Sequence, residues 1–148
     1  MNNSTGGLAG TVPTMAERGT LSMRSNKSKD TKPEMRLRQA LRKHGLLGYR
    51  VHMPGLPGKP DVCFTKQKVA VFVHGCCWHR CPNCRLPDPK TNAEYWLPKL
   101  RRNVERDAQH TVALQEAGWA VVVVWECEVK RNLEGCVEQV ATTLKQRS

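Results

Sequence analysis

The stretch that decides the fold runs from residue 56 to residue 74 and reads LPGKPDVCFTKQKVAVFVH. It contains two strand candidates, residues 61–64 and residues 69–74, each apolar except for Asp61 and His74, and four polar residues join them. Two short apolar runs separated by a polar turn are typical of a β-hairpin. A turn rich in proline and glycine, residues 54–58, precedes the hairpin and separates it from a short strand predicted over residues 49–52.

Helical patterns lie on both sides of this hairpin. Thr31 and Glu34 have the spacing of a capping box, which predicts a helix that begins near Thr31 and ends near Lys43. A long helix is predicted over residues 92–116, with Pro98 as the alternative start.

The C-terminal third adds a strand and a helix. Residues 119–125 form a continuous apolar run, which is typical of a strand buried on both faces. A last helix is predicted over residues 133–145. The order of elements, α-β-β-β-α-β-α, predicts an α/β fold in which a mixed central sheet is flanked by helices.

Length and hydropathy argue against several classes of protein. A chain of 148 residues suits one domain. It has no apolar run of about 18 residues, which argues against a transmembrane helix. Its first residues, MNNSTGGLAGTVPT, lack the charged and apolar regions of a secretory signal. We therefore expect a soluble, cytoplasmic protein.

The charge is unevenly distributed along the chain. Lys and Arg number 24 against 13 acidic residues, for a net charge of +11. The excess is +7 in residues 1–50 and +5 in residues 51–107, and it changes to −1 in residues 108–148. A basic excess confined to part of the chain favours one face that binds a polyanion, with nucleic acid as the first candidate. A solvated basic surface is the alternative.

The first 28 residues differ in composition from the rest of the chain. They are rich in Gly, Ser, Asn, Thr and basic residues and show no apolar periodicity, which is typical of a flexible arm. We therefore predict a flexible basic arm over residues 1–28 and a folded domain over residues 29–148.

The cysteine content indicates a metal site. Seven cysteines, an odd number without a secretory signal, argue against a disulfide framework. Cys76, Cys77, Cys81 and Cys84 lie within nine positions, and such clusters favour metal ligation. A redox pair of Cys81 and Cys84 is the alternative.

Asp61 stands where a nuclease would place a metal ligand. A Pro-Asp pair that enters a hairpin strand resembles the restriction-endonuclease-like core, in which the aspartate holds a divalent metal. The second strand of that core usually supplies an acidic residue and a lysine. Here those positions hold Phe72 and His74, so the common form of the motif is broken.

Six blocks of sequence, taken in order, point to one family of nucleases. The chain resembles the very short patch repair (Vsr) endonucleases over about residues 22–130, through the blocks SKDTKPE (28–34), LPGKPD (56–61), VHGCCWH (73–79), YW (95–96), NVERD (103–107) and GWAVVVVWEC (118–127). The resemblance implies a restriction-endonuclease-like core with a structural zinc site. It also implies an enzyme that nicks DNA on the 5′ side of the thymine in a T:G mismatch, the product of 5-methylcytosine deamination.

The resemblance implies a catalytic magnesium ion. Asp61 matches its principal ligand, and the backbone carbonyl of Val73 matches a second one. Glu34 matches an acidic residue that supports the waters of the metal, although a capping-box glutamate needs no further explanation.

Two histidines match the active-site histidines of the family. They are His74 and His79, and the resemblance pairs His79 with Asp107, which would orient its imidazole for proton transfer. The sequence leaves open which histidine acts as base and which acts as acid.

Four cysteines match a structural zinc site. The resemblance adds Cys127, at the end of the apolar run, to Cys76, Cys81 and Cys84. The family site mixes cysteine with histidine, whereas this chain would have four thiolates, which zinc also accepts.

Aromatic and basic residues match the DNA contacts of the family. Trp78 and Trp96 match aromatic residues that wedge into the base stack beside the mismatch. Cys77 stands where the family has phenylalanine, so the wedge is smaller here. Met23 and Arg24, in the basic arm, would contact the DNA backbone or minor groove.

The implied partner is double-stranded DNA that carries a T:G mismatch. The resemblance also implies a monomer, mismatch-repair proteins of the MutL type as partners, and a bacterial, cytoplasmic protein that is nucleoid-associated when bound to DNA. Two alternatives are a zinc-containing DNA-binding module without catalysis and a restriction-type nuclease that cuts both strands of matched DNA.

Overall fold

The structure is a computed structural model that describes residues 30–148. Its elements in chain order are α2 (Lys32–Lys43), β1 (Arg50–Val51), β2 (Val62–Phe64), β3 (Val69–His74), α3 (Ala93–Glu116), β4 (Ala120–Trp125), α4 (Glu126–Arg131) and α5 (Leu133–Gln146). The predicted arm, with Met23 and Arg24, lies outside the described residues. No helix within residues 30–148 is both long and apolar enough to cross a membrane.

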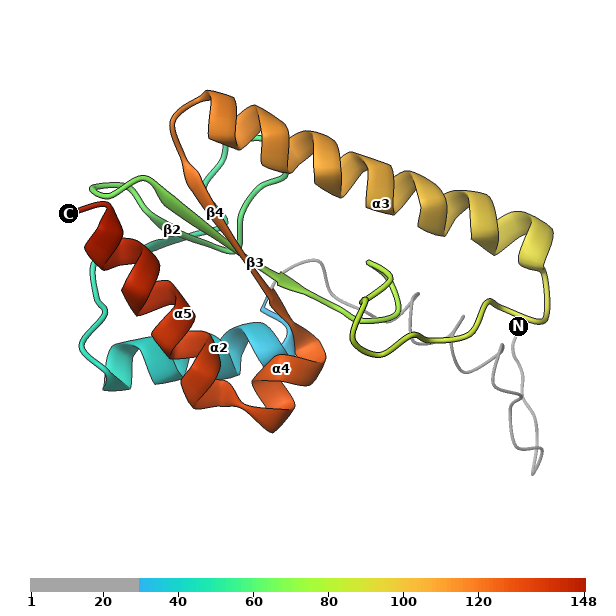
Figure 1. Cartoon of the computed structure of the whole chain (residues 1–148), viewed down its shortest axis with the longest axis horizontal. Helices are drawn as coiled ribbons and strands as arrows, with labels where there is room; N and C mark the ends of the chain where they lie inside the picture. The colour runs from blue at the N-terminus through green and yellow to red at the C-terminus, as the bar shows by residue number, and fades with distance from the viewer. Residues whose placement is uncertain (1–29) are drawn as a thin grey trace.

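The strands form one four-stranded sheet in the order β1-β2-β3-β4. β2 pairs with β1 and with β3 in antiparallel fashion, and the register that joins Val62 to Val71 closes the predicted hairpin. β3 pairs with β4 in parallel, so that His74 lies opposite Trp125. The predicted mixed sheet flanked by helices is therefore confirmed (Figure 1).

The sheet separates two hydrophobic cores, because successive side chains of a strand point to opposite faces. On the face covered by α2, α4 and α5, Val71 and Val122 belong to the larger core (Figure 1). On the face where α3 lies, Phe72 and Leu114 form a smaller cluster, against which Val123 packs. β4 is an edge strand, yet its apolar run faces a core on each side, as predicted.

α2 begins and ends where the sequence predicts. The Thr31 hydroxyl accepts a hydrogen bond from the Glu34 main-chain N–H at 3.4 Å, which caps the helix. Leu37 and Leu41 are fully buried in the larger core. Because Leu37 and Leu41 pack into the core, Glu34, which lies one turn before Leu37, is buried as well.

Two helix predictions need correction. α3 begins at Ala93 and contains Pro98, so the alternative start at Pro98 is wrong. A proline in the early turns removes a single main-chain hydrogen bond, and the 24-residue helix continues past it. The six-residue helix α4 was not predicted, because so short an element shows no apolar periodicity. Its local signal is Glu128, whose carboxylate accepts the Trp125 N–H at 2.9 Å.

The loop between β1 and β2 packs against α3 at Gly58. Gly58 has a φ of +75°, and a Cβ at this position would lie 2.9 Å from Nδ1 of His110 in α3. Both the dihedral angle and the lack of space therefore require glycine. Because Gly58 precedes Asp61 by three residues, this contact helps to fix the chain that leads into β2.

We expect Gly58→Ala to lower the free energy of unfolding by about 2–4 kcal/mol. Roughly 1–2 kcal/mol comes from a left-handed conformation with a Cβ, and the rest comes from the forced displacement of His110. Gly55→Ala is the matched control, because Gly55 has a φ of +88° but a Cβ added there would meet nothing within 4 Å. This variant should lose only the roughly 1–2 kcal/mol that the left-handed conformation costs. Urea denaturation measures both losses, and equal losses would contradict a tight contact with His110.

Candidate active site and cysteine cluster

Asp61 lies at the start of β2, beside the end of β3. Its carboxylate Oδ2 accepts the main-chain N–H of Val73 at 2.7 Å, which joins two residues twelve positions apart. Burial raises the pKa of Asp61 to about 6, and the nearby charge of Glu34 acts in the same direction. The Val73 hydrogen bond and the charges of His52 and His79 oppose this shift without cancelling it. Asp61 is therefore a carboxylate that lacks full compensation for its negative charge.

His74 and His79 lie face to face. Their rings are stacked with centroids 3.9 Å apart and planes 9° apart. Nδ1 of His79 lies 2.6 Å from Oδ2 of Asp107, which α3 contributes from the opposite side of the loop. The structure thus places His79 against Asp107, the pair that the resemblance implies. The carboxylate orients the ring and favours a proton on Nδ1, which leaves Nε2 available to exchange a proton.

His74 is held in its neutral form. Its side chain is buried, and desolvation lowers its pKa to about 4, with the neighbouring His79 adding to the effect. Phe72 and Trp125 pack against the ring on its other sides. Within residues 30–148, Nδ1 of His74 has no hydrogen-bond partner. A buried nitrogen without a partner is costly, because no hydrogen bond offsets its desolvation.

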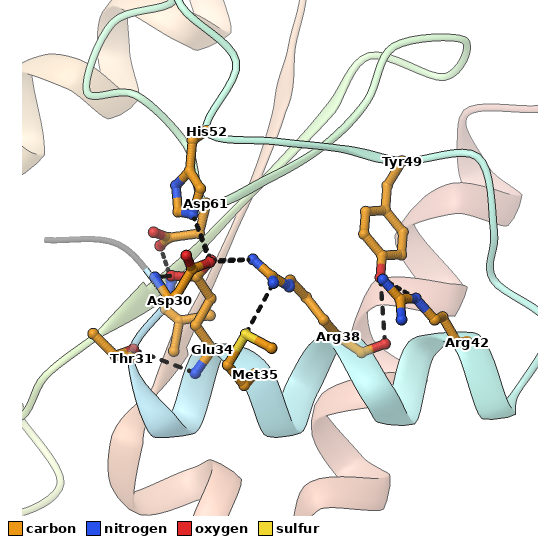
Figure 2. Close-up of polar contacts among 10 residues, drawn as sticks. Asp30, Thr31, Glu34, Met35, Arg38, Arg42, Tyr49, His52 and Asp61 are labelled. Atoms are coloured by element: carbon orange, nitrogen blue, oxygen red, sulfur yellow. Dashed lines mark hydrogen bonds and ion pairs between the residues drawn. The ribbon is translucent and has the colours of Figure 1, made fainter. Parts of the chain in front are cut away.

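Glu34 lies near Asp61 in a dense set of polar contacts (Figure 2). Its Oε2 accepts a hydrogen bond from Nη1 of Arg38 at 2.8 Å and lies 2.9 Å from Nε2 of His52. Its Oε1 accepts the main-chain N–H of Asp30 at 3.1 Å. Sequence reasoning pointed to Glu34 but missed Arg38 and His52. The i,i+4 spacing of Glu34 and Arg38 was a usable signal, whereas His52 reaches Glu34 from a distant loop.

Four cysteines gather where β3 and β4 end. The parallel register sets His74 opposite Trp125, so Cys76 and Cys127, each two residues further on, emerge side by side. The sulfur atoms of the cluster, which lie within 4.8 Å of one another, belong to Cys76, Cys81, Cys84 and Cys127.

The cluster has the composition of a metal site. Sγ of Cys81 lies 3.7 Å from Sγ of Cys127, and the Cys127 N–H donates to Sγ of Cys76 at 3.4 Å. A redox pair of Cys81 and Cys84 would leave the convergence of the other two sulfurs unexplained. Cys63 and Cys136 lie elsewhere, buried in the protein interior.

Comparison with known proteins agrees with this geometry. Residues 12–85 match the model of the family described as DNA mismatch endonuclease Vsr. The chain is 45% identical to the Type II nicking enzyme V.NaeI of Lentzea aerocolonigenes, over 92% of this chain and 82% of that protein. It is 41% identical to the DNA mismatch endonuclease Vsr of Escherichia coli, over 73% of this chain and 69% of that protein. The chain belongs to the Vsr family.

Membership of the Vsr family makes the protein a DNA endonuclease, a hydrolase that acts on DNA. A further relative, the Type II nicking enzyme V.NmeDIP of Neisseria meningitidis serogroup C, is 42% identical over 84% of each chain. The family resemblance inferred from the sequence is therefore confirmed. Nuclease chemistry of this family also fits a metal cofactor, for which the described residues offer carboxylate and thiol groups.

The two tryptophans expected to contact DNA differ in exposure. Trp78 is half-buried, and its carbonyl accepts a hydrogen bond from Nδ2 of Asn103 in α3 at 3.4 Å. Trp96 is only 7% exposed, whereas its neighbour Tyr95 is 57% exposed and meets it edge to face. Nζ of Lys99 lies over both rings, 5.1 Å from the Tyr95 centroid and 5.7 Å from the Trp96 centroid. In this Vsr-family chain, Tyr95 is therefore the accessible aromatic side chain of this segment.

The raised pKa of Asp61 predicts a pH-dependent cost in stability. As the pH rises from about 4 to about 6, the unfolded chain releases this proton before the folded chain does, so the free energy of unfolding falls. Above pH 6 the full cost is present, and the difference between 3.8 and about 6 corresponds to about 3 kcal/mol.

Asp61→Asn should remove this cost and keep an acceptor for the Val73 N–H. In buffer without added divalent cations, we expect the variant to be more stable than the parent by up to about 3 kcal/mol at pH 7.5 and equally stable at pH 4. Urea denaturation at both pH values measures the difference. Asp88→Asn, which removes a carboxylate whose side chain is 62% exposed, is the control and should not be more stable than the parent at pH 7.5. Equal stability of Asp61→Asn and parent at pH 7.5 would contradict the argument.

Proposed function

We propose that this protein nicks one DNA strand 5′ of the thymine in T:G mismatches that arise from 5-methylcytosine deamination. The hydrolysis would depend on magnesium and take place on a restriction-endonuclease-like core. The observation that carries the proposal is the position of Asp61, a half-buried acidic residue in electrostatic reach of the His79–Asp107 pair. Together with membership of the Vsr family, this arrangement supports phosphodiester hydrolysis over mere DNA binding.

Asp61 fits a magnesium ligand. Its half-buried carboxylate has its negative charge only partly compensated, and a bound divalent cation would complete that compensation. The Asp61 carboxylate and the backbone carbonyl of Val73 are hard oxygen donors, which magnesium prefers. When bound, the ion would polarise a phosphate oxygen and make a bound water more acidic. Glu34, fixed nearby, would accept hydrogen bonds from the waters of the metal.

The two histidines divide the work of proton transfer in this proposal. His79, oriented by Asp107 through Nδ1, exchanges a proton at Nε2 with the attacking water or the leaving oxygen. His74 stays neutral and supports the His79 ring by stacking.

We propose zinc for the four-cysteine cluster. Two thiolates at the Zn–S distance of about 2.3 Å from a shared tetrahedral centre lie about 3.8 Å apart. The Cys81–Cys127 separation of 3.7 Å fits this geometry. Four protein ligands would leave no open position, so the zinc would be structural and would tie the 76–84 loop to the end of β4.

Recognition of the mismatch is proposed to involve intercalation. Trp78 and Trp96 would enter the base stack, assisted by the arm residues Met23 and Arg24. Because Trp96 is only 7% exposed, its insertion would require a local rearrangement around Tyr95. We further propose that the protein acts as a monomer on nucleoid DNA in the bacterial cytoplasm, with proteins of the MutL type as partners.

A nicking assay tests the proposed function directly. With magnesium, the parent should cut only the thymine-containing strand of a T:G duplex and should leave the matched T:A duplex intact. Asp61→Asn should slow nicking about a thousandfold while DNA affinity changes little, because the change removes the metal ligand but almost no contact surface. Asp88→Asn is the matched control and should nick like the parent.

The alternatives give different products in the same assay. A protein that binds the duplex but never cuts it would be a DNA-binding module without catalysis. Cleavage of both strands of the T:A duplex would indicate a restriction-type nuclease. Undiminished nicking by Asp61→Asn would show that another residue holds the metal.

The zinc assignment predicts one zinc ion per chain. Cys81→Ser should lose the ion and melt at a markedly lower temperature, because the binding energy of a structural zinc contributes to folding. Cys77→Ser is the control, since Cys77 is exposed and lies next to the cluster without belonging to it, and it should keep the zinc. Elemental analysis and thermal melts provide the measurements. Absence of zinc from the parent, with an unchanged melt for Cys81→Ser, would refute the assignment.

A further inference from the structure

His52 connects the two acidic residues of the site. Its main-chain N–H donates to the carbonyl of Asp61 at 3.2 Å, and its Nε2 lies 2.9 Å from Oε2 of Glu34. The residue lies in the loop after β1 with a φ of +50°, a conformation that is uncommon for residues other than glycine. Such backbone strain persists only where the surrounding structure holds it. Figure 2 shows the His52 ring beside both carboxylates.

Glu34 is held from three directions. The Asp30 N–H bonds to one carboxylate oxygen, and Arg38 and His52 approach the other. The Glu34 side chain is 1% exposed, and the side chains of Arg38 and His52 are 11% and 14% exposed. A buried carboxylate is costly unless it is paired and hydrogen-bonded, and here both conditions are met. Its position is therefore fixed before any ligand binds.

The same contacts argue against a second cation at this place. Ligand atoms of Asp30, Glu34 and His52 lie within 4.8 Å of one another, as in a metal site. However, Nη1 of Arg38 donates to both carboxylates, at 2.9 Å to Asp30 and 2.8 Å to Glu34. The guanidinium already occupies the cation position, and a divalent ion beside it would be repelled. The cluster is therefore suited to hold Glu34 in place and not to bind a metal.

We propose that His52 is a positioning residue for the nicking reaction. Its side chain and Arg38 clamp the Glu34 carboxylate from two sides, and its main chain ties that clamp to Asp61. The carboxylates of Glu34 and Asp61 would then be held at a fixed distance from each other, and the waters around the catalytic magnesium would bind to carboxylates that are already in place. This inference rests on the proposed function, and it assigns His52 no contact with the DNA or the metal. Partners that orient the groups around a metal commonly change metal affinity by 10- to 100-fold.

Two amide substitutions of His52 test whether its side chain must be long enough to contact Glu34. His52→Gln carries an N–H at about the reach of Nε2, whereas the shorter amide of His52→Asn ends near the position of Nδ1. Asparagine also tolerates a positive φ, so this variant should keep the loop conformation. We expect the magnesium concentration for half-maximal nicking to rise at least about tenfold in His52→Asn and to stay within about threefold of the parent in His52→Gln. The nicking rate at saturating magnesium should change little in either variant.

A second readout does not depend on activity. Magnesium stabilises a protein that binds it only in the folded state. The gain in unfolding free energy grows as RT ln(1 + c/Kd), where c is the free magnesium concentration, and this gain raises the melting temperature. The magnesium-dependent rise should require about tenfold more magnesium in His52→Asn than in the parent. His44→Asn is the matched control, because Nε2 of His44 also lies 2.9 Å from a glutamate, the exposed Glu134, far from the site. It should bind magnesium like the parent.

The outcomes separate this inference from the proposed function. The inference is wrong if both amide variants bind magnesium like the parent, or if both lose the same magnesium affinity. Either result would mean that the contact of His52 with Glu34 does not position the site. A parent that neither nicks a T:G duplex nor is stabilised by magnesium would overturn the proposed function together with this inference. A parent that does both, with an unchanged His52→Asn, would overturn the inference alone.

Discussion

Parallel pairing between β3 and β4 is the constraint on which the site depends. Strands that run in the same direction end at the same edge of a sheet, so the residues that follow them converge. Here that register sets His74 opposite Trp125 and brings Cys76 next to Cys127. A slip of one residue would turn His74 to the opposite face and would separate the two sulfur atoms. The histidine pair and the cysteine cluster are therefore two consequences of one register.

α3 contributes to the site through two separate contacts. Asp107 orients His79, and His110 packs against Gly58 in the loop that leads to Asp61. The two helix residues lie three positions apart, on the same side of the helix. Consequently, one rigid helix sets both the direction of the imidazole and the position of the loop before the aspartate.

Local sequence patterns predicted most of the fold but only part of the site. The hairpin of residues 61–74 and the helix after Thr31 were predicted, because turn residues, apolar runs and caps act over a few positions. The pairing of His79 with Asp107 followed from resemblance to a family, since no local rule joins residues 28 positions apart. Neither the local sequence patterns nor the family resemblance identified His52. Its contact with Glu34 depends on the left-handed backbone conformation of His52 and on the register of β1. Neither feature can be predicted from the residues around His52.

The two acidic residues of the site are held in opposite electrostatic states, and this difference suits their proposed roles. Glu34 has its negative charge balanced by Arg38 and its oxygens occupied by donors, so it has little capacity left for a cation. Asp61 is half-buried and accepts one main-chain N–H, and desolvation raises its pKa because its negative charge is only partly compensated. A divalent ion gains most where a carboxylate is poorly compensated, because binding there relieves the cost of burial. The same fold would therefore direct the proposed cation to Asp61 and keep Glu34 as a fixed acceptor for its waters.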